Sequence, residues 1–105
     1  TPEQVAAAAI QEDVDLVGLS CLSGAHRVLF PRVVELLREK NASDITVIGG
    51  GIIPEQDFDM LYQAGIQAIF TPGTSLDSIV EWIRNHIQTR HAQETPKSLT
   101  HGNNG

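Results

Sequence analysis

The chain of 105 residues lacks the features of several functional classes. A single cysteine, Cys21, excludes an internal disulfide framework and a cysteine-rich zinc site. The net charge is −6 and no basic stripe is present, so we expect no nucleic-acid partner. The longest apolar run, residues 5–10, is far too short to cross a bilayer, and no signal-like leader precedes it. We therefore predict a cytoplasmic protein without a membrane partner.

Metal and catalytic patterns are scarce as well. The four histidines show no metal-ligand spacing, so we predict no metal site within the chain. Ser20 or Ser23 could be combined with His26 as nucleophile and base, but no nucleophile elbow is present, and we predict no catalytic residues. We expect His26 to be a surface or capping residue, Asp57 to lie on a solvated helix face and Trp82 to serve packing.

The chain alternates between helical and strand patterns. Thr1 and Gln4 form a capping box for a first helix, Ser75 or Thr74 caps the last, and Gly65 ends the one between. Pro31 fits best in a first turn, which predicts a helix start near Leu29 or Phe30. The spacing of apolar residues predicts helices over 1–12, 28–40, 54–65 and 75–87, and strands over 14–20, 45–48 and 66–70.

This alternation predicts an α/β fold, a Rossmann-like (flavodoxin-like) parallel sheet with flanking helices, in which three of an expected five strands are present. We expect residues 1–89 to form the domain. Residues 90–105 contain one large apolar residue, Leu99, and bury too little surface to offset the entropy of ordering. We therefore expect a disordered tail over 90–105.

Polar and glycine-rich loops follow all three expected strands. They comprise residues 20–24, 49–51 and 71–74, and the carboxyl ends of parallel strands share one rim where ligands bind. Glycines allow close approach of a ligand to the backbone, and hydroxyls can hydrogen-bond a polar heterocycle. The same residues also form ordinary turns and helix caps, so on the residues alone both interpretations stay open.

The motif spacing resembles the cobalamin-binding domain of methylmalonyl-CoA mutase and related acyl-CoA mutases. That family combines D-x-H-x-x-G, S-x-L and a later G-G. Ser20-Cys21-Leu22 matches S-x-L, and the 27 residues from 23 to 49 separate it from Gly50-Gly51. The flanking segments 11–15, 24–26, 52–58 and 71–74 match too. D-x-H-x-x-G does not occur, and we expect the cobalt ligand and two strands to precede Thr1.

The resemblance implies roles for seven residues around the benzimidazole tail of cobalamin. Ser20 would hydrogen-bond the benzimidazole, and Leu22 would pack on it. Gly50 and Gly51 would let the tail pass close to the backbone. The remaining side of the tail slot would be lined by Phe70, Gly73 and Thr74.

The implied function is the adenosylcobalamin-binding part of an acyl-CoA mutase that catalyses a radical carbon-skeleton isomerisation, with methylmalonyl-CoA mutase as the nearest type. We expect no catalysis by this chain alone. A large substrate-binding mutase subunit or domain would be the partner, and the acyl-CoA would bind through it. A corrinoid carrier or sensor module without mutase activity, and a truncated remnant that binds nothing, are the alternatives.

Overall fold

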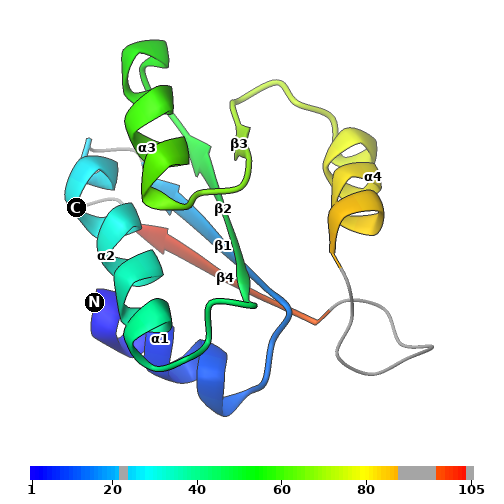
Figure 1. The fold of residues 1–105 in the computed structure, drawn as a ribbon. Coiled ribbons are helices and arrows are strands. Elements are labelled where there is room, and N and C mark those ends of the chain that lie inside the picture. Colours follow the sequence, from blue (N-terminus) through cyan, green and yellow to red (C-terminus); the bar gives the residue numbers. More distant parts are fainter. Residues whose placement is uncertain (22–23, 88–96, 104–105) are drawn as a thin grey trace.

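The computed structural model of the protein describes residues 1–21, 24–87 and 97–103. Its strands are all parallel and form one sheet in the order β3-β2-β1-β4. Helices α1, α2 and α3 lie on one face and α4 on the other (Figure 1). The predicted α/β class is confirmed. The elements are α1 (Pro2–Gln11), β1 (Leu16–Cys21), α2 (His26–Glu39), β2 (Thr46–Gly51), η1 (Glu55–Asp57), α3 (Phe58–Ala64), β3 (Ile69–Phe70), α4 (Leu76–His86) and β4 (Ser98–Asn103).

The helix ends follow the capping signals of the sequence. The Thr1 hydroxyl accepts a hydrogen bond from the backbone N–H of Gln4, and the Gln4 side chain completes the capping box. The Ser75 hydroxyl accepts from the backbone N–H of Ser78 at 3.1 Å and so caps α4. Gly65 ends α3 with a φ of 112°, a left-handed conformation that favours glycine.

The two faces of the sheet are covered to different extents. Val17, Leu19 and Val47 point toward α1, α2 and α3 and belong to the larger core cluster, which also holds Phe30 and Leu61. The opposite face has a smaller cluster of Leu16, Ile48, Ala68 and Ile87, against which Trp82 and Ile83 of α4 are only partly buried. Helix α4 contributes no fully buried side chain. This face is therefore thinly covered, as the single helix beside it in Figure 1 indicates.

Two expected boundaries are wrong. Helix α2 begins at His26 rather than near residue 29 or 30, and Pro31 lies inside it. An internal proline removes the hydrogen bond that its missing N–H would have donated one turn back, and the helix forms despite that loss. Strand β3 comprises only Ile69–Phe70, although the preceding residues still run along β2, where Gln67 N donates to Val47 O at 2.8 Å.

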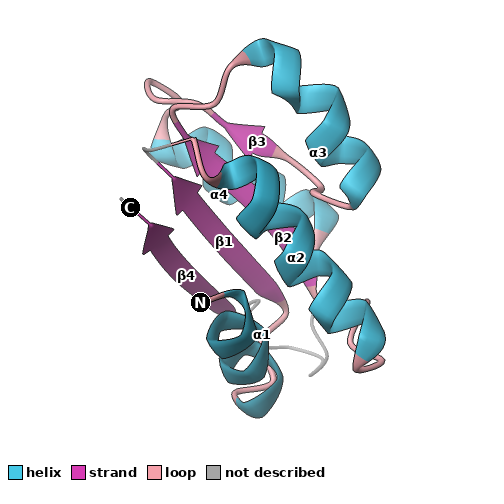
Figure 2. Ribbon diagram, turned by 90° about the vertical axis from the view of Figure 1, so that its left-hand side faces the viewer, coloured by secondary structure: helices cyan, strands magenta, loops and turns pink. Residues whose placement is uncertain are grey.

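The expectation of a disordered tail over 90–105 is wrong for part of that range. Residues 98–103 form β4, which pairs with β1 along all six residues of that strand. Figure 2 shows β4 beside β1, on the side away from β2. The sheet consequently has four strands where the sequence indicated three. The polar segment is held by backbone pairing with β1: Leu16 N donates to Lys97 O at 3.1 Å, and Lys97 N donates to the Asp15 carboxylate at 2.9 Å. Residues 90–96 lie outside the described residues.

Candidate functional site

Three residues from the predicted site lie in one row across the sheet. In the parallel register Ser20 of β1 stands opposite Gly50 of β2, and Gly50 stands opposite Phe70 of β3. All three are at the carboxyl ends of their strands, the rim where ligands of open α/β sheets bind. In the sequence Gly50 lies 30 positions after Ser20, and Phe70 lies 20 positions after Gly50. The sheet brings the three residues side by side.

The row lines a groove of about 410 Å³ on the thinly covered face. This volume falls within the range of roughly 300–1,000 Å³ that is usual for small-molecule sites. The exposed Ser20 hydroxyl lies among mostly apolar walls. Such a groove fits a flat, largely apolar ring with one polar edge. The lining residues are Gly18, Leu19, Ser20, Ile48, Gly49, Gly50, Phe70, Ile79, Thr100 and His101.

Each glycine of the run that ends β2 also has a structural reason. A Cβ on Gly49 would lie 2.8 Å from Cε2 of the buried Phe30 ring. A Cβ on Gly50 would lie 3.1 Å from the carbonyl oxygen of Phe70, so glycine there permits the close approach of β3. Gly51 has a φ of 99°, which favours glycine. The run is therefore required by the fold whether or not a ligand passes over it.

Three of the other predicted site residues are not part of the groove. The Thr74 hydroxyl donates to Thr71 O at 2.8 Å and so closes its own turn. Gly73, with a φ of 97°, belongs to the same turn, and within the described part of the chain no heavy atom beyond its two neighbours lies within 4 Å of the position its Cβ would take. Gly51 follows Gly50 but does not line the groove. Leu22 lies outside the described residues.

Sequence reasoning missed further groove residues on this face, among them Ile79, Gly18 and Thr100. Ile79 shows the helical spacing of an inward-facing residue, which could have placed it opposite the strand ends. Gly18 lies in mid-strand, where a missing side chain signals that something approaches closely. Thr100 gives no such signal, because its segment is polar and its pairing with β1 depends on tertiary context.

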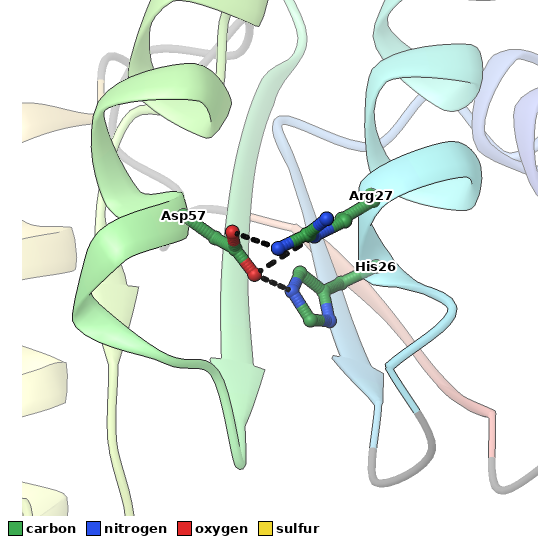
Figure 3. Close-up of polar contacts among 3 residues, drawn as sticks. All are labelled: His26, Arg27 and Asp57. Atoms are coloured by element: carbon green, nitrogen blue, oxygen red, sulfur yellow. Dashed lines mark hydrogen bonds and ion pairs between the residues drawn. The ribbon is translucent and has the colours of Figure 1, made fainter.

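A buried polar cluster joins the starts of α2 and α3 beside the same rim (Figure 3). His26 Nε2 lies 2.9 Å from Asp57 Oδ2, and the Arg27 guanidinium donates to both carboxylate oxygens at 3.1 and 2.8 Å. His26 and Asp57 are 2% and 5% exposed. The expectations of a surface histidine and a solvated aspartate are both wrong. The cluster links two helices, α2 and α3, that follow β1 and β2 in the chain.

The hydrogen bonds set the ionisation and the tautomer of this cluster. Hydrogen bonds from Arg27 and then His26 hold the pKa of the Asp57 carboxyl below its ordinary value, against the opposing effect of burial. The carboxylate in turn raises the pKa of Arg27. The Nε2–H tautomer of His26 donates to Asp57 and leaves Nδ1, which is buried and has no hydrogen-bond partner among the described residues, as an acceptor. We assign this tautomer because an ionised carboxylate can only accept, so the nitrogen that faces Asp57 carries the proton.

Two other kinds of site are absent from the part of the chain that the structure describes. In the described ranges, no cluster of three or more histidine, cysteine, aspartate or glutamate side chains could hold a metal ion. None of the described helices is long and apolar enough to cross a membrane.

A comparison with known families identifies the domain. Residues 1–81 match the model of the B12 binding domain. The chain belongs to the B12-binding domain family. The match covers β1, β2 and β3, and with them the row of Ser20, Gly50 and Phe70.

The similar proteins are acyl-CoA mutases. The chain is 49% identical over 88 residues to the methylmalonyl-CoA mutase of Cereibacter sphaeroides, an alignment that covers 84% of this chain and 12% of that protein. It is 41% identical over 91 residues to the methylmalonyl-CoA mutase of Escherichia coli, covering 87% and 13%. It is 39% identical over 93 residues to the 2-hydroxyisobutanoyl-CoA mutase small subunit of Aquincola tertiaricarbonis, covering 89% and 68%. The B12-binding chain thus spans about an eighth of the two methylmalonyl-CoA mutases.

Proposed function

We propose that this chain binds the benzimidazole tail of cobalamin in the groove at the carboxyl ends of β1, β2 and β3. The observation that carries the proposal is the row of Ser20, Gly50 and Phe70 along a groove of about 410 Å³. The apolar walls would bury the ring, and the Ser20 hydroxyl would hydrogen-bond a ring nitrogen. Gly50 leaves the floor of the groove without a side chain.

The domain would serve a larger enzyme. We propose that it is the adenosylcobalamin-binding part of an acyl-CoA mutase of the methylmalonyl-CoA mutase type. The names of the relatives support this, and so does the small share of the methylmalonyl-CoA mutases that the domain matches. When bound, the cofactor supplies the initiating radical by homolysis of its cobalt–carbon bond. The residues of this chain would hold and orient the tail, and a substrate-binding subunit or domain would hold the acyl-CoA.

Equilibrium dialysis against hydroxocobalamin tests binding directly. We expect saturable binding, and much weaker binding of cobinamide, which lacks the benzimidazole tail. Ser20→Ala should weaken hydroxocobalamin binding about two- to tenfold, the effect of one hydrogen bond, because the exposed hydroxyl carries no part of the core. Ser43→Ala is the matched control, since Ser43 is also exposed but precedes β2, at the opposite end of the sheet. Equal affinity for hydroxocobalamin and cobinamide would contradict the proposal.

A chimaera tests the role in a mutase. The 88 aligned residues of the Cereibacter sphaeroides enzyme would be replaced by those of this chain, and turnover of methylmalonyl-CoA measured with added adenosylcobalamin. We expect turnover to be retained, and to need a higher cofactor concentration when the chimaera also carries Ser20→Ala. A folded chimaera that binds the cofactor but shows no turnover would contradict the mutase assignment and leave the binding assignment intact.

A further inference from the structure

A buried aromatic ring supports the floor of the groove from the other face of the sheet. Phe30 of α2 belongs to the larger core cluster, and its ring occupies the space that a side chain at Gly49 would need. The backbone of Gly49 lines the groove on the opposite face. The position of the Phe30 ring therefore determines how far this part of the floor can move away from a bound ligand.

The Phe30 ring is in turn held by His26, which lies one turn earlier in α2. The two ring centroids are 6.2 Å apart at an interplanar angle of 64°, the edge-to-face arrangement that aromatic pairs prefer. His26 Nε2 donates to Asp57 Oδ2 at 2.9 Å, and this buried hydrogen bond fixes the orientation of the imidazole ring. Figure 3 shows the imidazole and the Arg27 guanidinium converging on that carboxylate. Asp57, His26 and Phe30 thus form a continuous series of contacts that ends at Gly49.

We propose that His26 is a positioning residue for the cobalamin tail. The inference rests on the proposed function, because the groove that His26 positions is the proposed tail site. Held by Asp57, the imidazole ring fixes Phe30, and Phe30 supports the backbone of Gly49 from the side opposite the ligand. A groove whose floor is fixed before binding spends less of the binding free energy on ordering the protein. His26 thereby raises the affinity for the tail without contacting it.

The hydrogen bonds of the cluster allow His26 to be replaced in a folded chain. Without the imidazole, each carboxylate oxygen of Asp57 keeps one donor, because Arg27 Nε donates to Oδ2 at 3.1 Å and Arg27 Nη2 donates to Oδ1 at 2.8 Å. The carboxylate then stays paired with a cation, and no uncompensated charge is buried. His26→Leu also fills the buried position with an apolar side chain. This variant therefore removes the ring beside Phe30 and leaves the link between α2 and α3 in place.

The test compares two substitutions within α2 of the full chain. We expect His26→Leu to raise the dissociation constant for hydroxocobalamin about two- to tenfold in equilibrium dialysis, the effect of one lost hydrogen bond. Leu37→Val is the matched control for stability: Leu37 is buried in the same core cluster but lies near the end of α2, away from the rim. We expect it to lower the urea midpoint and to bind like the parent. Affinity that falls equally in both variants would follow stability and would overturn the inference.

A double-mutant cycle on affinity supplies the second measurement. In a Phe30→Leu background His26 has no ring to act through, so His26→Leu should then change the dissociation constant less than twofold. Independent effects of the two substitutions, or unchanged affinity of His26→Leu alone, would overturn the inference while leaving the proposed function in place. A parent chain that binds no hydroxocobalamin would overturn both. Far-UV circular dichroism checks folding, and His26→Gln, which keeps an amide donor for Asp57 but lacks the ring, replaces His26→Leu if that variant does not fold.

Discussion

The glycine at position 49 provides a quantitative test of how tightly the rim is packed. In Gly49→Ala the new Cβ would lie 2.8 Å from Cε2 and 3.2 Å from Cδ2 of Phe30, which is 2% exposed. Carbon atoms prefer about 3.5–4.0 Å, so the ring or the strand must shift by about 1 Å. Overpacking of this kind costs about 1–3 kcal/mol. Alanine also restricts the unfolded chain, which offsets about 0.4–1 kcal/mol. We expect net destabilisation of about 1–2 kcal/mol.

The assay is urea unfolding followed by circular dichroism, and the midpoint should fall without a change in slope. Gly18→Ala is the matched control, because its nearest neighbour would be the methyl group of exposed Thr100 at 3.4 Å, an ordinary contact. We expect that variant to be neutral or slightly stabilised. The double variant Gly49→Ala, Phe30→Leu should be less destabilised than the sum of the two single variants, with a coupling of about 0.5–3 kcal/mol. Additive effects, or equal stability of the two alanine variants, would refute the proposed clash.

Three further variants test the buried polar cluster around Asp57, a helix cap and the core. Arg27 and then His26 hold the pKa of Asp57 below its ordinary value, so the carboxylate stabilises the fold above its unfolded pKa and loses this effect as the pH falls through the folded value. Asp57→Asn should therefore lose stability at pH 7, and its difference from the parent should shrink below about pH 4 in urea midpoints. Ser75→Ala should cost about 1 kcal/mol in the same assay and lower the helical circular dichroism signal, by removing the N-cap of α4. Leu61→Ala, at a fully buried position, should cost about 2–5 kcal/mol and lower the thermal midpoint.

The elements that depend on local chemistry could be predicted from the sequence. The capping box at Thr1, the Ser75 cap and the left-handed Gly65 are set by neighbouring residues, and each is present in the structure. The meeting of Ser20 and Gly50 was also predictable, because both follow strand patterns and parallel strands share one carboxyl rim.

The features that were wrong depend on distant partners. His26 and Asp57 are 31 residues apart, and the sequence around each one alone predicts a surface residue. The packing of α2 against α3 buries the two side chains together. The β4 segment has no strand signal of its own, and its strand conformation depends on pairing with β1. In each case the stabilising contact is made by a partner far away in the sequence, which no local pattern can identify.

The structural roles of the glycine run change how ligand binding must be tested. A side chain at Gly49 meets Phe30, and one at Gly50 meets the Phe70 carbonyl. Lost binding in a variant at either position would have two explanations, a blocked groove or a displaced strand, and affinity alone cannot separate them. Ser20 and Thr100 are exposed, on adjacent strands, and line the groove without supporting the core. We therefore expect removal of the Ser20 hydroxyl to change the affinity for the ligand with little change in the fold, so that recognition can be measured at this position apart from stability.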